Sequence, residues 1–268
     1  MIVPRENAPS RRLDALVAET TGLTRSQARG LILAGKVRID DARATKPGTT
    51  VRDGARVHVD AQPRYVSRGG DKLEGALDAF ALEPAGLDAL DVGASTGGFT
   101  DVLVQRGARH VTALDVGYGQ LAWKLRGDPR VTVVERTNFR TLGDDAFPGG
   151  FDLIVIDASF ISLRTIVARA AAYLRGDGRI VALVKPQFEA GRERLGSGGV
   201  VRDAAVHRSV LREVRDGIVA LGLAPVALTP SPLVGPAGNR EFLMLIRRRG
   251  NPLADARIDE AVGEDLTP

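Results

Sequence analysis

The stretch from residue 88 to residue 115 constrains the fold more than any other part of the chain. Asp88-Ala89-Leu90-Asp91-Val92 is a short apolar run that predicts a buried strand, and a glycine-rich turn at residues 93–98 follows it directly. A helical pattern begins at Phe99, and a second apolar run at residues 111–114 ends at Asp115. A strand, a glycine turn, a helix and a strand that closes on a carboxylate form half of a nucleotide-binding sheet.

The spacing of the glycines indicates the cofactor. Dinucleotide sites use Gly-x-Gly-x-x-Gly, whereas this turn has the spacing Gly-x-x-x-Gly-Gly. Such a turn favours S-adenosylmethionine over NAD, because it brings backbone close to a ligand without cradling a pyrophosphate; an ordinary strand-to-helix turn is the alternative. We expect the methionine end of the cofactor to be lined by Gly93, Ala94, Ser95, Gly97, Gly98 and Phe99. We also expect Asp115 to hold the ribose, Asn138 to contact the adenine and Asp157 to lie beside the cofactor.

Composition excludes several classes of protein. The chain has no cysteine, which excludes disulfides, zinc–thiolate sites and a cysteine nucleophile. Its three histidines are scattered, and we expect no metal site. No apolar run approaches the ~20 residues that span a bilayer, and the first residues lack the apolar core of a signal peptide. We therefore expect a soluble cytoplasmic protein, and the sequence leaves its oligomeric state open.

Basic residues are concentrated near the N-terminus. Residues 1–68 contain 13 Lys and Arg against 7 Asp and Glu, while the whole chain contains 37 against 33, so the rest of the chain has a small acidic excess. This asymmetry predicts a module that binds a polyanion, attached to a nearly neutral domain; a merely solvated basic surface is the alternative.

The N-terminal module is predicted at residues 1–60, followed by a linker at 61–66. We expect a helix that begins at Arg11, a second helix from Thr24 to near Gly35 with Thr24 and Gln27 as a capping box, and strands at residues 36–40 and 56–59. The candidate RNA-binding residues are Arg11, Arg12, Arg25, Arg29, Lys36 and Arg38 in the module and Arg68 beyond it.

Helices and strands alternate through residues 67–250, as in a doubly wound α/β sheet, and residues 251–268 are predicted to be a C-terminal tail. Five further strands are expected at residues 131–134, 153–156, 180–184, 225–228 and 242–246. The last two are joined by too little chain for a helical crossover, so we expect them to be antiparallel. The fold is thus predicted to be a Rossmann-like, seven-stranded methyltransferase sheet with its last strand antiparallel, preceded by a small α+β RNA-binding domain.

Four charged residues are expected to meet at one edge of this sheet. Asp157 and Lys185 each follow a predicted parallel strand, and ligands of such sheets bind outside the carboxyl ends of the strands. Glu241 begins the reversed strand, so it lies at the same edge, and Lys72 opens a helix before the first strand. Taken singly, each would be a surface charge or part of an ion pair. Their convergence with the glycine turn favours a functional site.

These residues carry a resemblance to a known family. Lys72, Asp157, Lys185 and Glu241 match the Lys-Asp-Lys-Glu tetrad of FtsJ-like ribose 2′-O-methyltransferases. Tyr-Val-Ser-Arg-Gly-Gly-x-Lys-Leu, Asp-Val-Gly-Ala-Ser-Thr-Gly-Gly-Phe-Thr and Val-Lys-Pro-Gln-Phe-Glu resemble the TlyA family, also named hemolysin A. The N-terminal module resembles the S-four-type RNA-binding domain, through its Arg-Leu-Asp, Thr-Arg-Ser-Gln-Ala and Gly-Lys-Val-Arg-Ile-Asp strings. The resemblance implies methylation of cytidine ribose in 16S rRNA, 23S rRNA or both, within ribosomal subunits.

The expected chemistry accounts for the residue types. A ribose hydroxyl must lose its proton as it attacks the methyl group, and a lysine amine acts as a base only when its pKa is lowered towards neutrality. We therefore assign Lys185 as the base or hydroxyl-orienting group and Lys72 as its partner, while Asp157 and Glu241 orient the amines. A non-catalytic ribosome-assembly or RNA-binding factor is the alternative. Hemolysin activity is disfavoured, because the chain has no membrane-spanning segment.

Overall fold

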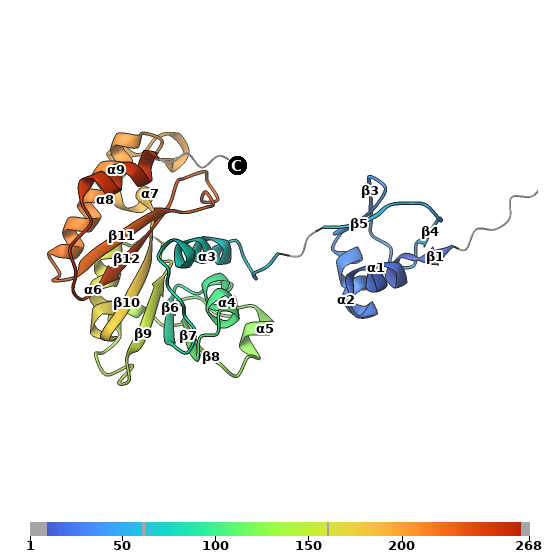
Figure 1. The fold of residues 1–268 in the computed structure, drawn as a ribbon, viewed down its shortest axis with the longest axis horizontal. Helices are drawn as coiled ribbons and strands as arrows, with labels where there is room; N and C mark the ends of the chain where they lie inside the picture. Colours follow the sequence, from blue (N-terminus) through green and yellow to red (C-terminus); the bar gives the residue numbers. More distant parts are fainter. Residues whose placement is uncertain (1–9, 61–62, 160, 264–268) are drawn as a thin grey trace, which may run out of the picture. The chain divides into compact units, whose positions relative to one another are not determined.

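The computed structural model describes residues 10–60, 63–159 and 161–263, and the chain forms two units, Met1–Pro63 and Arg64–Pro268 (Figure 1). The ends of the predicted RNA-binding domain and C-terminal tail, and two linker residues, lie outside the described residues. The predicted domain limits at residues 60, 66 and 250 stay predictions.

The described residues of the N-terminal unit form two helices and five short strands. In chain order they are β1 (Arg11–Arg12), α1 (Leu13–Thr21), α2 (Arg25–Leu33), β2 (Val37–Ile39), β3 (Ala42–Ala44), β4 (Thr50–Val51) and β5 (Val57–Val59). Strand β2 pairs antiparallel with β3 and β5, while β1 pairs with β4. The small core between helices and strands includes Leu13, Val17, Ala28, Ile32 and Val37.

Most of the local predictions for this unit are confirmed. Thr24 caps α2, and both hydrogen bonds of the capping box with Gln27 are present. The prediction that a helix begins at Arg11 is wrong by two residues. Arg11 and Arg12 pair with Val51 and Thr50, which keeps the backbone extended until α1 begins at Leu13.

The second unit is built on a seven-stranded sheet. Its strands are β6 (Asp88–Val92), β7 (His110–Leu114), β8 (Val131–Val134), β9 (Phe151–Ile156), β10 (Leu174–Val184), β11 (Ala224–Pro230) and β12 (Phe242–Arg247). Their order across the sheet is β11-β12-β10-β9-β6-β7-β8. Neighbouring strands in the part β10-β9-β6-β7-β8 of the sheet are parallel, whereas β12 is antiparallel to both β10 and β11. The predicted sheet with a reversed last strand is confirmed.

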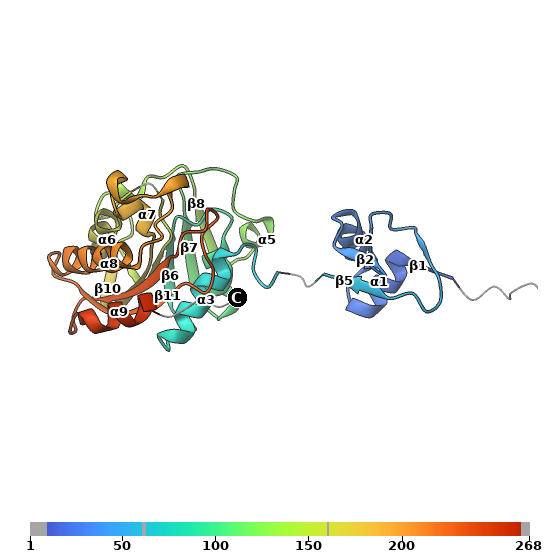
Figure 2. The same ribbon diagram turned by 90° about the horizontal axis from the view of Figure 1, so that it is seen from above.

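Helices cover both faces of this sheet. They are α3 (Gly69–Ala79), α4 (Gly98–Gln105), α5 (Trp123–Arg126), α6 (Leu163–Ala172), α7 (Pro186–Glu189), α8 (Ala204–Val219) and α9 (Asp255–Gly263). Strand β9 shows the two faces, because Ile154 and Ile156 belong to the core beneath α6, α8 and α9, while Leu153 and Val155 belong to the core beneath α3 and α4. Figures 1 and 2 show α6 and α8 side by side.

Within the predicted C-terminal tail, α9 buries Ile258, Ala261 and Val262 against the core, so this part of the tail belongs to the folded unit. Among the residues that the structure describes, no helix has the length and apolar character needed to cross a membrane.

Candidate active site

The glycine turn between β6 and α4 is shaped for close contact. Gly93 has a φ of +87°, a value that side chains disfavour, and a Cβ there would lie 2.4 Å from the carbonyl oxygen of Asp157. Ser95 also adopts a positive φ, of +49°. Glycine at position 93 is therefore required for the turn to pack against the end of β9.

Asp115 joins this turn to the end of β7. Its Oδ2 accepts a hydrogen bond of 2.7 Å from the backbone N–H of Ser95, and its Oδ1 accepts one of 2.6 Å from Gly117. A carboxylate has about four acceptor sites, so lone pairs remain for the hydroxyls of a ligand. The arrangement holds an acidic group, in a defined orientation, over the carboxyl edge of the sheet.

Two cavities lie side by side at this edge. One, of about 600 Å³, is lined by Asp115 and Asn138 among others, and a second, of about 360 Å³, is lined by Lys72, Ala94 and Phe99 among others. Gly93, Ser95 and Asp157 line both. An elongated ligand can therefore extend from Asp115, past the glycine turn and Asp157, towards Lys72.

Most of the predicted cofactor residues line these cavities, and Gly98 lines the smaller one. Gly97 lines neither: a Cβ on it would lie 2.4 Å from Leu125 and 2.8 Å from Leu121, so this glycine serves the packing of α5 against the turn. Asn138 lines the larger cavity, and its side-chain oxygen accepts a hydrogen bond of 3.1 Å from the N–H of Arg140.

Sequence reasoning missed several residues of the larger cavity. They include Gln120, Thr137 and Ser159. Each lies a few residues beyond the end of a parallel strand, and ligands bind at this edge. Position after a strand end is thus the signal that could have identified them.

The four charged residues form two ion pairs. Lys72 pairs with Glu241, and the side chains of both are almost fully buried. The Nζ of Lys185 lies 2.5 Å from Oδ1 of Asp157 and donates a hydrogen bond of 2.9 Å to Oγ of Ser159. Because Asp157 and Lys72 line the same cavity, both pairs border one space.

The fold places these residues by the directions of the strands. Asp157 and Lys185 directly follow β9 and β10, which are parallel neighbours. Glu241 directly precedes β12, which runs antiparallel to β10, so the start of β12 lies beside the end of β10. Lys72 is in the first turn of α3. Two amines and two carboxylates at one edge, beside a cavity, can orient a hydroxyl and accept its proton.

Comparison with known families agrees with this geometry. The FtsJ-like methyltransferase family matches residues 65–248, which is more than half of the chain, and the S4 domain matches residues 11–57.

The chain belongs to the FtsJ-like methyltransferase family.

Similar proteins share both parts of the chain. The "16S/23S rRNA (cytidine-2'-O)-methyltransferase TlyA" of Mycobacterium tuberculosis is 50% identical over 94% of this chain and 95% of its own length. "Hemolysin A" of Brachyspira hyodysenteriae is 39% identical over 87% of this chain and 98% of its own. A solved structure from Streptococcus thermophilus, named for a hemolysin, is 43% identical, covers 95% of both chains and has a TM-score of 0.72.

A further acidic residue of this FtsJ-like methyltransferase was missed by the sequence analysis. Asp91 is fully buried in β6, beside the glycine turn, and burial raises its pKa to about 7, while the hydroxyl of Thr100 donates a hydrogen bond of 2.6 Å to Oδ2. Its Oδ1 has no hydrogen-bond partner among the described residues. An aspartate within an apolar strand was the available signal, since buried carboxyl groups are rare unless they are paired or functional.

Two arginines of the N-terminal unit pair with one buried carboxylate. Asp14 is buried, and it accepts hydrogen bonds from Arg12 (2.9 and 3.1 Å) and Arg25 (3.3 Å). These two ion pairs hold the pKa of Asp14 well below its usual range. Arg29 lines the same shallow hollow, so three arginines share one surface whose organising residue, Asp14, the sequence analysis did not single out.

The other predicted RNA-binding residues lie apart from this hollow. Arg11 pairs with Glu19, Arg38 pairs with Asp60 at 2.9 Å, and Lys36 is exposed. Arg68 belongs to the second unit, where it lines the smaller cavity and donates a hydrogen bond of 2.8 Å to the carbonyl of Val234.

No group of three or more His, Cys, Asp or Glu side chains in the described part of the chain is arranged to hold a metal ion.

Proposed function

We propose that the protein uses S-adenosylmethionine to methylate the 2′-hydroxyl of cytidine in 16S rRNA, 23S rRNA or both, within ribosomal subunits. The observation that carries the proposal is the pair of lysine–carboxylate contacts, Lys72–Glu241 and Lys185–Asp157, beside the cavity that adjoins the glycine turn. The substrate is proposed from the printed activity of the Mycobacterium tuberculosis relative, which matches nearly the whole chain. Ribosomal subunits as substrate would place this activity in the cytoplasm.

The residues of the two cavities fit S-adenosylmethionine. Asp115 has free acceptor sites for ribose hydroxyls, and Asn138 lies in the same cavity, where it could contact the adenine. Because Gly93 has no side chain, the backbone of the turn can approach the cofactor closely. When bound, S-adenosylmethionine supplies an electrophilic methyl group on a sulfonium sulfur. The carboxylate of Asp157, which lines both cavities, would lie between the cofactor's two ends.

The chain's own residues have to align the ribose hydroxyl and accept its proton. Lys185 is suited to orienting the hydroxyl, because Asp157 and Ser159 both contact its amine and its side chain is only 11% exposed. The Lys72–Glu241 pair is buried nearby and would hold the ribose or its phosphate in position. Such alignment provides much of the rate in reactions that need two reactants in line.

The N-terminal unit would supply RNA affinity. Arg12, Arg25 and Arg29 share one exposed hollow, and guanidinium groups bind phosphates in a bidentate manner. The described residues of this unit include no Phe, Tyr or Trp, so contacts to phosphates and to the shape of the RNA would dominate over base stacking.

Methyl transfer to ribosomal subunits that lack the modification tests this function. The small and the large subunit are incubated separately with labelled S-adenosylmethionine, and the modified nucleotide is mapped after alkaline hydrolysis. We expect label at a cytidine whose 3′ phosphodiester resists alkali, because a 2′-O-methyl group removes the attacking hydroxyl. Label on an alkali-labile nucleotide would indicate base methylation. No label with either subunit would favour a non-catalytic ribosome-assembly factor.

A further inference from the structure

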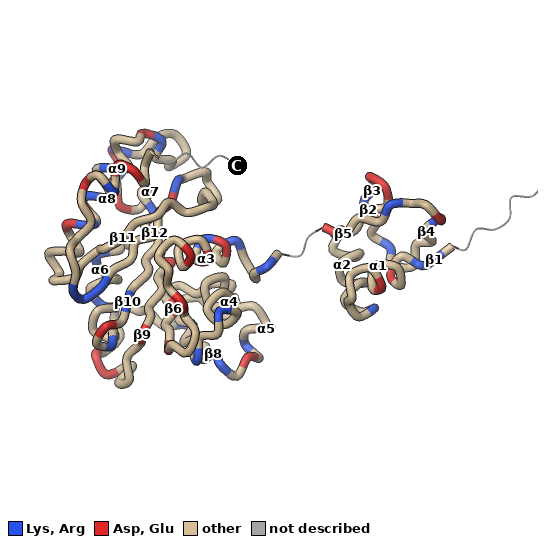
Figure 3. Tube along the Cα trace, in the orientation of Figure 1, with Lys and Arg blue, Asp and Glu red and all other residues tan. Residues whose placement is uncertain are grey.

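A cluster of arginines lies at the edge of the sheet opposite the active site. Arg179 lies midway along β10, where its pairing with β12 begins, and Arg247 ends β12; the two are directly opposite each other in the antiparallel register. Arg248 and Arg249 continue the chain from β12, and Figure 3 shows this basic segment following the strand. We call Arg179, Arg247, Arg248 and Arg249 the distal arginine cluster.

The distal arginine cluster lacks compensating charge. No ion pair to Arg179, Arg247 or Arg249 is formed by the residues that the structure describes. One acidic residue, Asp177, lines the same hollow. Like charges directly opposite each other on paired strands are destabilising. The facing pair Arg179–Arg247 therefore has an electrostatic cost in the free protein, which a bound anion would relieve.

Neighbouring arginines behave differently. Arg109 and Arg175 each contact Asp88, at 2.7 and 2.9 Å, and Arg175 also contacts Asp152 at 3.0 Å. Their charges are used within the fold. Among the described residues, a lack of acidic partners is therefore not a general property of the arginines at this edge.

One member of the cluster has a structural role. Arg248 donates hydrogen bonds of 2.8 and 2.6 Å to the carbonyl oxygens of Ala171 and Leu174, which anchors the chain beyond β12 to the end of α6. The guanidinium groups of Arg247 and Arg249 form no such bond with any residue that the structure describes, and both residues are exposed. The four arginines line one hollow of about 590 Å³ together with the turn at residues 176–178, and its lining contains no apolar side chain.

The cluster is too far from the active site to hold the same phosphate. Arg179 and Val184 are five residues apart along β10, which corresponds to roughly 17 Å at the usual rise of a strand. Lys185 and the catalytic edge lie beyond Val184. A ligand that contacts both edges must therefore be extended.

We propose that the distal arginine cluster binds backbone phosphates of the ribosomal RNA, in a segment separate from the nucleotide that is modified. This inference rests on the proposed function, which makes an extended RNA the substrate. Arginine is the residue best suited to phosphate, since its planar group donates two parallel hydrogen bonds. A membrane surface fits less well, because peripheral membrane sites pair basic with apolar side chains and this hollow has none.

The test compares the full-length protein with the double variant Arg247→Gln/Arg249→Gln, in which Arg248 is kept. Affinity for isolated ribosomal subunits is measured over a range of salt concentrations. If each arginine neutralises one phosphate, the slope of log K against log salt should become less steep by about 1.4–1.8. The ratio of the unaltered protein's affinity to that of the variant should therefore fall about tenfold between 50 and 200 mM salt. Affinity for S-adenosylmethionine and thermal stability should be unchanged.

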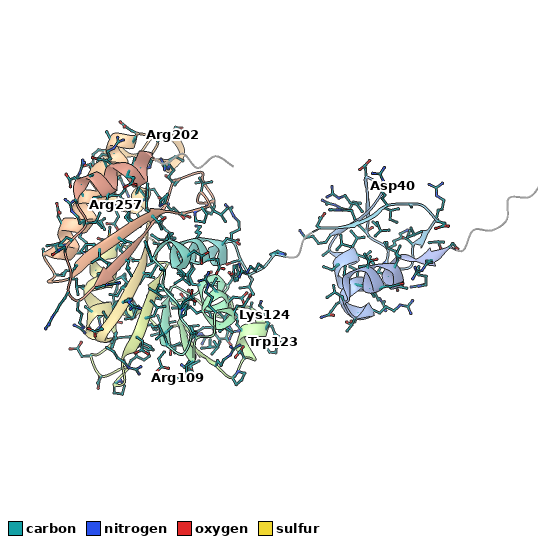
Figure 4. All side chains as sticks on the ribbon, viewed as in Figure 1. Asp40, Arg109, Trp123, Lys124, Arg202 and Arg257 are labelled. Carbon is teal, nitrogen blue, oxygen red and sulfur yellow. The ribbon has the colours of Figure 1, made fainter. Side chains whose placement is uncertain are left out.

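A matched control removes two arginines that already have partners. Arg257 pairs with Glu260 and Arg208 with Asp259, and Arg257 is labelled on α9 in Figure 4. Arg257→Gln/Arg208→Gln changes the net charge equally, and its salt slope should match that of the unaltered protein.

Three outcomes would overturn the inference. The distal variant and the control could have equal salt slopes, or both could lose the same amount of affinity for ribosomal subunits. In the third outcome, the distal variant keeps its RNA affinity but no longer binds phosphatidylcholine–phosphatidylglycerol vesicles. Failure of the proposed function is seen separately, as an absence of ribose methylation by the unaltered protein.

Discussion

The Nζ of Lys185 and the Oδ1 of Asp157 lie 2.5 Å apart, at the ends of two neighbouring parallel strands. The side chain of Lys185 is 11% exposed and that of Asp157 26%, so the pair is largely shielded from water and still borders the cavities. A charge pair in such a position keeps the amine in one orientation. The proposed reaction requires an amine held in such a fixed orientation beside the hydroxyl.

Replacing this lysine should stop the reaction without unfolding the protein. Lys185→Ala is expected to lower the rate of methyl transfer by about 10²–10⁴-fold, which is the usual contribution of a positioned acid or base. Affinity for S-adenosylmethionine should change little. Single-turnover kinetics with saturating ribosomal subunits measure the rate, and calorimetry measures cofactor binding.

Ser159→Ala serves as the companion to this variant, because it removes the hydrogen bond to Nζ and keeps the carboxylate contact. A smaller decrease is expected from it than from Lys185→Ala. Activity of Lys185→Ala equal to that of the unaltered protein would remove this lysine from the mechanism.

Asp115→Ala should weaken the binding of S-adenosylmethionine. Loss of hydrogen bonds to a charged group costs roughly 1.5–3 kcal/mol, which corresponds to about 10- to 150-fold in the dissociation constant. The turn should also loosen, since Asp115 accepts hydrogen bonds from Ser95 and Gly117. Calorimetry and thermal unfolding separate the two effects. The exposed Asp53→Ala is the control, and equal affinities in both variants would contradict the assignment.

The stability of the protein should depend on the ionisation of Asp91. In the folded state burial raises its pKa to about 7, whereas an unfolded aspartate titrates near 3.9. Between these pH values the folded state binds the additional proton, so the contribution of this group to the free energy of unfolding falls as pH rises from about 4 to about 7. Asp91→Asn removes this dependence, and its advantage over aspartate should grow to a few kcal/mol at pH 7.

Urea unfolding at several pH values measures that difference. Asp41→Asn, at an exposed position outside the distal arginine cluster, is the control and should follow the unaltered protein at every pH. A constant difference between Asp91→Asn and the unaltered protein, from pH 4 to pH 7, would show that Asp91 does not titrate in this window.

The N-terminal unit should account for a large share of RNA affinity. A chain that begins at Arg64 is expected to fold, because its core is separate, and to bind S-adenosylmethionine but methylate ribosomal subunits poorly. In the full chain, Arg29→Gln and Lys36→Gln leave the Asp14 ion pairs intact, and each should reduce the salt slope by ~0.7–0.9. Arg257→Gln is the control. Slopes that stay equal would mean that the basic residues form only a solvated surface.

Local signals in the sequence were sufficient for much of the fold. The apolar runs at 88–92 and 131–134 match β6 and β8 residue for residue, and Thr24 and Gln27 form the capping box that their spacing indicates. Strands and helix caps depend on neighbours a few residues away. The antiparallel last strand also followed from sequence, because a short connection permits no crossover.

Short strands and irregular ends needed the tertiary structure. The pairing of Arg11 and Arg12 with β4 depends on residues about 40 positions later in the chain. The helix α9, within the predicted tail, is stabilised by burial against α8 and β11. Neither contact leaves a periodic pattern strong enough to be seen locally.

For the site, the sequence by itself indicated that Asp157, Lys185 and Glu241 lie at one edge of the sheet, since strand ends and strand direction specify that edge. It placed Lys72 beside Lys185 as a partner, but only the tertiary structure decided that Lys72 pairs with Glu241 and Lys185 with Asp157. The tertiary structure also decided that Gly97 packs against Leu121 and Leu125 and that Asp14 pairs with two arginines. The physical reason is that an ion pair depends on the distance and direction between side chains from separate elements, and no spacing along a single chain segment contains that information.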